Sequence, residues 1–378
     1  MIQKPFQIFA LLLSLLICNY SYGWDKDERT TTVNYYNNPV LKGIDAPDPC
    51  IWQDPSTKMF YTFYSIQNDN SKHIYQSKNL VDWTDTGKPA FTDDDFHKMV
   101  SGTSKPSATS IGLWLWAPQV IYHQGRYLMY IAIAGDDRCK IHSGIAVLTS
   151  DAPDGYFRFQ GIVTSYGGND PQHYPSNGIY CSIDPCPAID EQGHLWLFFG
   201  SVGQVYRIRL TDDGLSIFPG SHYQLMAGTY SRGKADKSTL CEGTFLYHHQ
   251  GYWYLFASRG QYNDYSYSLV VARSKSLNGP FVNKRGIPMT HGGFEVLLQS
   301  SPGDAWYGCG HNGEIYKDLT GRYYLCYHCH GPESKENINN HGDQFRYMMV
   351  QQLYWGQDGW PSFHHGKPQI NHNRKPIF

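Results

Sequence analysis

The sequence predicts an all-β protein, folded as a five-bladed β-propeller in a single domain. Composition and an internal repeat lead to this prediction. Aromatic residues make up 15% of the 378 residues, and they favour strands because they pack well on pleated surfaces. The 37 Gly and 21 Pro indicate many turns between short strands. One strand pattern recurs five times, at a spacing that suits propeller blades.

The repeat is an aromatic-rich strand that follows a turn. Its copies begin 58 to 70 residues apart, at Lys58, Gly125, Gly193, Gly251 and Gly321. A shorter apolar strand precedes each copy, and these strands are expected at 49–52, 119–122, 187–190, 244–247 and 314–316. A third strand follows, most clearly at 144–150 and 269–275, and then a short fourth. Four antiparallel strands per repeat make a blade. The alternative is a β-sandwich with accidental periodicity.

Residues 1–23 are expected to be a signal peptide, followed by the propeller over 24–378. Lys4 supplies the positive start, and the apolar run 9–18 is too short to span a bilayer. Cys18 ends that run, which keeps a lipoprotein signal and a lipid anchor at Cys18 as an alternative. We therefore expect an exported protein, periplasmic or secreted, with no membrane span.

The net charge and the cysteine content limit which partners and cofactors can be expected. A net charge of -2 gives no reason to expect a nucleic acid, and we expect a monomer. Eight cysteines follow Cys18, and some can pair in an oxidising compartment, with the connectivity open. Cys326, Cys329 and His330 match the C-x-x-C-H sequence that attaches c-type haem. A strand would point the two thiols to opposite faces, which disfavours haem.

Three acidic residues precede inner strands of different blades: Asp48, Asp184 and Glu242. The inner strands of a propeller converge on one central channel, so carboxylates at their starts can meet. Glu242 lies in an otherwise apolar run, where the protonated form of a carboxyl is favoured. A general acid needs that form. For each residue taken alone, a turn or capped-loop role is the alternative.

Five motifs, one per blade, resemble the successive motifs of glycoside hydrolase family 43. The closest resemblance is to the endo-α-1,5-L-arabinanases, and it extends from about residue 37 to 361. The motifs are Asp48-Pro49, Trp116-Ala117-Pro118-Gln119-Val120, Ile183-Asp184-Pro185, Cys241-Glu242-Gly243 and Gly310-His311-Asn312-Gly313.

This resemblance implies hydrolysis of an arabinan-type polysaccharide by single displacement with inversion. Asp48 would be the general base that activates water, and Glu242 the general acid that protonates the leaving oxygen. Asp184 would keep Glu242 protonated and oriented. An inverting pair must be roughly 6.5–9.5 Å apart to leave room for the water, a gap that two blades facing across a channel can supply.

The resemblance also implies binding residues. Trp116 would be a platform for a sugar ring, with Phe245 as a further substrate contact. Arg346 would bind a substrate hydroxyl or pair with a catalytic Asp. His311 would lie beside a central cation, calcium or another, held mostly through water because a hard cation prefers oxygen ligands. A histidine satisfied within the core is the alternative for His311.

Two departures from the arabinanase pattern put the substrate in question. Pro47 stands where arabinanases often have His, and Cys181-Ser182 stands where they commonly have Asn-Ala. An exo-acting α-L-arabinofuranosidase or β-xylosidase, which needs a closed pocket rather than an open groove, is therefore an alternative. The loops 93–106 and 170–177 would wall such a groove. A non-catalytic glycan-binding propeller is the alternative of another class, but a pure binder needs no general acid.

Overall fold

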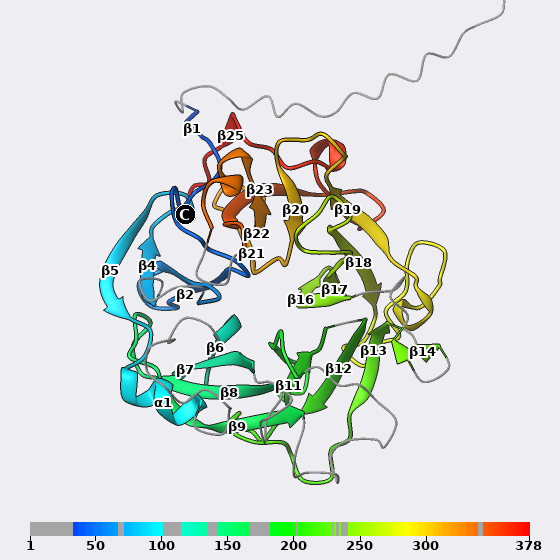
Figure 1. Cartoon of the computed structure of the whole chain (residues 1–378). Helices are drawn as coiled ribbons and strands as arrows, with labels where there is room; N and C mark the ends of the chain where they lie inside the picture. Colours follow the sequence, from blue (N-terminus) through cyan, green and yellow to red (C-terminus); the bar gives the residue numbers. More distant parts are fainter. Residues whose placement is uncertain are drawn as a thin grey trace, which may run out of the picture. The chain divides into compact units, whose positions relative to one another are not determined.

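Antiparallel sheets form five blades in the compact unit Tyr35–Phe378 of this computed structural model (Figure 1). The structure describes residues 33–66, 72–100, 115–134, 143–166, 182–201, 203–228, 230–231, 234–235, 241–338 and 343–378. The predicted signal peptide, Cys18, Cys139 and Cys181 lie outside these ranges. So do residues 101–106 and 170–177 of the predicted groove walls.

Each blade runs in chain order from the channel outward (Figure 1). Blades one and two contain β2 (Cys50–Gln53), β3 (Phe60–Phe63), β4 (His73–Ser77), β5 (Trp83–Pro89), β6 (Leu115–His123), β7 (Arg126–Ala134), β8 (Ser143–Ser150) and β9 (Arg158–Tyr166). Blades three and four contain β10 (Cys186–Ile189), β11 (Leu195–Phe199), β12 (Gln204–Arg209), β13 (Gln224–Gly228), β16 (Glu242–His249), β17 (Tyr252–Arg259), β18 (Ser268–Ser274) and β19 (Glu295–Gln299). Blade five contains β20 (Tyr307–Gly310), β21 (Ile315–Lys317), β22 (Tyr323–His330), β23 (Tyr347–Trp355) and β24 (Pro361–Ser362).

The predicted repeat is confirmed, because the five aromatic strands are the second strands β3, β7, β11, β17 and β22. Their apolar side chains are buried against the neighbouring blades. Phe63 and Ile131 share one cluster between blades one and two, and Leu128 and Leu197 share another between blades two and three. Burial on both faces explains why these strands carry continuous apolar runs rather than an alternating pattern.

The inner strands differ from the prediction in their extent. β6 and β16 begin at Leu115 and Glu242, ahead of the expected 119 and 244. In blade five, β20 and β21 both pair with β22, and residues 311–314 interrupt the inner strand between them. Trp116 and Glu242, two of the predicted site residues, lie in the additional segments of β6 and β16.

One helix replaces part of a predicted loop. α1 (Asp93–Val100) begins where the sequence suggested a loop over 93–106. The Thr92 hydroxyl accepts the N–H of Asp95 at 3.2 Å and donates to its carboxylate at 2.6 Å. The negative charges of the three acidic residues Asp93–Asp95 interact favourably with the positive N-terminal end of the helix dipole. Two turns of helix are too short to show a clear period in sequence.

The ring closes between blade five and the segment before blade one. The Asn38 side chain bonds both backbone groups of Val350 in β23, at 2.8 and 3.0 Å. The carboxylate of Glu314 accepts the N–H of Ile51 in β2 at 2.5 Å. The remaining elements are β1 (Tyr35–Tyr36) paired with β25 (Asn373–Arg374), β14 (Tyr230–Ser231) paired with β15 (Lys234–Ala235), and the 3-10 turns Met289–His291, Pro332–Lys335 and His364–Gly366.

The cysteine arrangement rules against the haem motif. Cys329 forms a disulfide with Cys309, which joins β20 to β22, so it has no thiol for a haem thioether. The described cysteines that are not in this disulfide are buried, and they are Cys50, Cys186, Cys241 and Cys326. In the part of the chain that the structure describes, no helix has the length and apolar character needed to cross a bilayer.

Candidate active site

Every blade has a residue with a left-handed backbone in its inner strand or within two residues of it, and we call this position the bend of the blade. The five residues, with their φ angles, are Asp48 (53°), Ala117 (45°), Asp184 (54°), Gly243 (58°) and His311 (48°). This conformation is uncommon and disfavoured for residues other than glycine, and it concentrates at functional sites. Every blade has such a residue, so the bend is a feature of the repeat and not of one loop.

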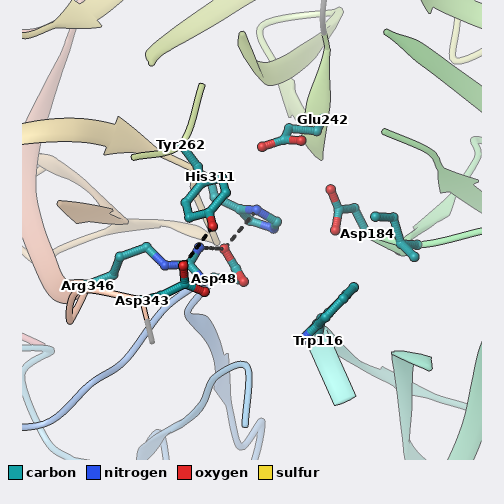
Figure 2. A pocket seen from close by; sticks show the side chains of 9 residues that line it. Asp48, Trp116, Asp184, Glu242, Tyr262, His311, Asp343 and Arg346 are labelled. Carbon is teal, nitrogen blue, oxygen red and sulfur yellow. Dashed lines mark hydrogen bonds and ion pairs between the residues drawn. The ribbon is translucent and has the colours of Figure 1, made fainter. Parts of the chain in front are cut away.

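The bends direct side chains from all five blades into one pocket at the mouth of the channel (Figure 2). In blades one, three and five the left-handed residue itself lines the pocket. In blades two and four the pocket is lined instead by the residue that precedes the left-handed one. Glu242 therefore lies one position before the left-handed residue of its blade, whereas Asp48 and Asp184 are the left-handed residues of theirs. The pocket is lined by Asp48, Trp116, Ile183, Asp184, Glu242, Tyr262, His311, Asp343 and Arg346.

Six of the seven predicted site residues therefore come together. Phe245 is not among the residues that line the pocket, and it belongs to the apolar core of blades three to five. The strand is irregular between Glu242 and Phe245, and Phe245 pairs with Phe256 of β17. Its aromatic ring thus contributes to the core that blades three to five share.

Asp48 is surrounded by groups that stabilise its ionised form. The Arg346 guanidinium lies 3.0 Å from Oδ1, His311 Nδ1 lies 3.1 Å from the same oxygen, and the Ser65 hydroxyl donates to Oδ2 at 2.6 Å. Burial alone would raise the pKa of Asp48, but Arg346 and His311 outweigh it and hold that pKa well below its usual range. A carboxylate that stays ionised can accept a proton from water.

Asp184 has the opposite environment. Burial raises the pKa of Asp184 to about 7, and the charges of Glu242 and Asp48 add to the effect, while His311 and the Gly243 N–H oppose it. The Gly243 N–H donates to Asp184 Oδ2 at 3.0 Å. Repulsion between neighbouring carboxylates favours the retention of one proton by the pair near neutral pH.

Glu242 lies on the wall opposite Asp48 (Figure 2). The Tyr267 hydroxyl donates to its Oε1 at 2.7 Å, and the Ser201 hydroxyl donates to its Oε2 at 2.7 Å. Two hydroxyl donors from different blades thus fix the plane of this carboxyl group. Neither Tyr267 nor Ser201 was predicted from sequence.

The bent residues are tied to the preceding blade through their backbone N–H groups. The donor and acceptor pairs are Ala117 with Ser65, Gly243 with Asp184, His311 with Ser258, and Asp48 with His328, at 2.6 to 3.0 Å. The acceptors Ser65, Ser258 and His328 each stand seven residues after the start of a repeat, at Lys58, Gly251 and Gly321. That regularity is a sequence signal, but only the structure shows what the position does.

Two other pocket residues escaped prediction, because each lies in a connection without a motif. The Tyr262 hydroxyl donates to Asp343 at 3.1 Å, and the Arg346 guanidinium lies 5.0 Å from the centre of the Tyr262 ring. Figure 2 shows these residues grouped on the Asp48 side of the pocket, away from Asp184 and Trp116. They extend the polar wall beside the candidate base.

The donor set around His311 fits a hydrated cation. Among the described residues, no three His, Cys, Asp or Glu side chains converge as direct metal ligands. However, Thr244 Oγ1 and Asn312 Oδ1 are buried without a described hydrogen-bond partner. They follow Gly243 and His311 of the neighbouring blades four and five, and a Cβ added to Gly243 would lie 2.8 Å from His311 Cγ. Unpaired oxygens of this kind suit waters around a hard cation.

The whole propeller matches a known family. The model of "Glycosyl hydrolases family 43" matches residues 36–361. The chain belongs to glycosyl hydrolase family 43. It is therefore a glycosidase with the five-bladed fold of that family, and the family resemblance of the five motifs is confirmed.

Several members of glycosyl hydrolase family 43 are similar over most of the chain. The extracellular exo-α-(1→5)-L-arabinofuranosidase ArbA of Cellvibrio japonicus is 28% identical, covering 85% of this chain and 86% of that protein. An extracellular endo-α-(1→5)-L-arabinanase of Thermotoga petrophila is 27% identical, over 85% and 71%. The structure of a Cellvibrio cellulosa α-L-arabinanase complexed with arabinohexaose is 26% identical, with a TM-score of 0.67 over 85% of this chain and 96% of that one.

Proposed function

We propose that this family 43 enzyme hydrolyses α-1,5-linked L-arabinan by single displacement with inversion. The observation that carries the proposal is one pocket with two unlike carboxylates on facing walls. Asp48 is held ionised by Arg346 and His311, whereas Glu242 is oriented by hydroxyl donors beside buried Asp184. Relatives described as arabinanases and an arabinofuranosidase support the choice of sugar.

In the proposed reaction, Asp48 takes a proton from a water molecule as that water attacks the anomeric carbon. Glu242 delivers its proton to the glycosidic oxygen as the bond to the leaving sugar breaks. Asp184, whose pKa burial raises to about 7, accepts the N–H of Gly243, the residue next to Glu242, and so helps to hold the acid in place. Trp116, on the wall near Asp184, offers an aromatic face for a sugar ring (Figure 2).

Exo-cleavage of arabinosyl ends is the second candidate. The Cellvibrio japonicus relative that matches most of this chain is an exo-acting enzyme by name. A pocket that admits only a chain end would favour this mode, whereas an open groove would admit internal segments. The corresponding alternative for xylose is a β-xylosidase, which would remove xylosyl ends with the same three acids.

Product analysis distinguishes these activities. The protein would be incubated with debranched linear arabinan, xylan and nitrophenyl arabinoside, beside Glu242→Gln as control. A ladder of short arabino-oligosaccharides that the variant does not produce supports endo-cleavage. Release of monosaccharide alone moves the enzyme to the exo class. No release from any arabinose-containing substrate contradicts the proposal and leaves another glycan, or glycan binding alone.

A hydrated calcium ion in the central channel is part of the proposal. His311 would hold it together with waters on Thr244 and Asn312, and its charge would favour the ionised forms of nearby carboxylates. We expect chelator treatment to lower the unfolding midpoint and calcium to restore it. An unfolding midpoint that is the same with chelator and with calcium would contradict this assignment.

The proposed enzyme is exported, since the relatives named above are extracellular proteins. A lipid anchor at Cys18, cleavage after residue 23 and the monomeric state remain predictions. Mass spectrometry of the mature N-terminus tests the first two, and light scattering of the purified protein tests the third.

A further inference from the structure

Tyr267 is a buried residue that contacts the proposed acid from inside the fold. Its side chain is fully buried, and its hydroxyl donates to Glu242 Oε1 at 2.7 Å. Its ring packs closely against Gly310 of blade five, where an added Cβ would come within 2.5 Å of the ring. Gly310 therefore leaves the space that lets Tyr267 reach Glu242.

His328 is a buried residue that contacts the proposed base. Its Nδ1 lies 3.0 Å from the backbone N of Asp48, whose N–H it accepts, and 3.2 Å from Asp48 Oδ1. The side chain is completely buried, and burial lowers the pKa of His328 to about 3, which keeps the ring neutral and able to accept. In blades one and four, Ser65 and Ser258 accept the equivalent N–H groups.

These two side chains lie against each other. The rings of Tyr267 and His328 are parallel within 4°, with their centres 5.9 Å apart in an offset stack. A continuous path therefore runs from Glu242 through Tyr267 and His328 to Asp48, without passing through the pocket. The disulfide between Cys309 and Cys329 braces the same place, since Cys309 precedes Gly310 and Cys329 follows His328.

We propose that Tyr267 and His328 form an internal spacer that sets the separation between the general base and the general acid. Both are positioning residues, because neither lines the pocket. The inference rests on the proposed inverting mechanism, in which that separation must admit one water molecule. Two rigid aromatic rings confined by Gly310 and the disulfide suit such a spacer better than flexible side chains do.

The leaving group of the substrate tests the two halves of the spacer separately. A sugar leaving group needs protonation, whereas nitrophenolate leaves without a general acid. The substrates are α-1,5-arabinotriose and the 4-nitrophenyl glycoside of α-1,5-arabinobiose. Tyr267→Phe keeps the stack and loses the hydroxyl, so we expect kcat/KM to fall about 10- to 100-fold on arabinotriose and less than about 3-fold on the nitrophenyl glycoside.

His328 affects the base, which both substrates need. His328→Leu removes the acceptor, and we expect kcat/KM to fall about 10- to 100-fold on both substrates alike. His328→Asn places an amide oxygen near the position of Nδ1 and should recover most of that loss. Recovery by Asn distinguishes positioning of Asp48 from a general need for a large side chain.

Tyr327→Phe is the matched control. Tyr327 precedes His328 in β22, is fully buried, and donates to Gln351 at 2.6 Å within blade five. Its loss should lower stability about as much as Tyr267→Phe does, with the kcat/KM ratio between the two substrates unchanged. Rates are expressed per folded molecule, so partial misfolding does not alter the ratio.

The outcomes separate this inference from the proposed function. Equal effects of Tyr267→Phe on both substrates, or an altered ratio in Tyr327→Phe, would overturn the spacer. A wild-type protein that cleaves neither arabinoside would instead refute the proposed sugar. The same ratio is then measured on xylotriose and nitrophenyl xylobioside, because the spacer concerns the acid and the base and not the sugar.

Discussion

At the scale of single residues, the pocket separates two kinds of carboxyl environment. Asp48 faces a guanidinium and an imidazole, and Asp184 faces other carboxylates and buried backbone. The types and chain positions of these acids could be predicted from one sequence, because a carboxylate near the start of three of the five inner strands is visible in the repeat. The hydroxyl of Tyr267 could not, because no pattern links residue 267 to residue 242 before the fold brings them together.

Asp48→Asn should remove the proposed base without removing its volume. We expect turnover on arabinan to fall by at least about 10³-fold, since the attacking water loses its proton acceptor. Azide, which needs no deprotonation, should restore part of the rate and form a glycosyl azide. Mass spectrometry of the products with and without azide measures this. Near wild-type turnover without azide would exclude Asp48 as the base.

Arg346→Met should move the acidic limb of the kcat/KM profile to higher pH. Burial raises the pKa of Asp48, and Arg346 is the strongest group that opposes it, so its loss lets Asp48 bind a proton at higher pH. The ionised form of Asp48 is present above its pKa and is lost as pH falls. The acidic limb of the kcat/KM profile therefore moves with the pKa of Asp48. Arg273→Met, which removes an arginine stacked on Trp360, is the control and should leave the limb in place. An unmoved limb in Arg346→Met would contradict the pairing.

At the scale of elements, the left-handed bend in each inner strand builds the site. The repeat and its second strands were predictable, because long apolar runs and turn glycines mark them. The bends were not, since Ala117 has no preference for a positive φ, and Asp, Gly and His occur mostly outside such bends. In blade four the residue that lines the pocket is Glu242, which directly precedes the left-handed Gly243.

Gly243→Ala should displace His311. An added Cβ would lie 2.8 Å from His311 Cγ, in a backbone with φ of 58°. Gly251→Ala is the matched control, because Gly251 has φ of 74° in the same hairpin and nothing within 4 Å of an added Cβ. Both variants should lose roughly 1 kcal/mol of stability from the left-handed backbone. We expect only Gly243→Ala to lower kcat, by about 10-fold or more. Equal kcat in the two variants would show that the contact with His311 is unimportant.

At the scale of the whole molecule, the ring is held closed by pairs of residues far apart in sequence. Asn38 joins Val350, and Glu314 joins Ile51, from opposite ends of the chain. The number of blades could be predicted by counting repeats. The Cys309–Cys329 disulfide could not be predicted, since the number of cysteines leaves their connectivity open. The closing contacts could not be predicted either, since no sequence pattern marks a single Asn or Glu as a contact between distant segments.

Glu314→Gln should stabilise the ring increasingly as pH rises. Burial raises the pKa of Glu314 from 4.5 to about 8, so between these values the folded protein keeps a proton that the unfolded chain releases. The contribution of Glu314 to stability therefore falls as pH rises from about 4.5 to about 8. Gln does not titrate, so its unfolding midpoint relative to wild type should rise by roughly 2–5 °C between pH 5 and pH 8. Thermal unfolding at both pH values measures this difference, and a constant difference would refute it.

The central claim is direct displacement by water between Asp48 and Glu242. The most direct measurement is the anomeric configuration of the first-formed product, followed by proton NMR during hydrolysis of an α-1,5-linked arabino-oligosaccharide. A single displacement predicts that the β-anomer appears first and then equilibrates. If the α-anomer appears first, a covalent intermediate and a retaining mechanism would replace this account.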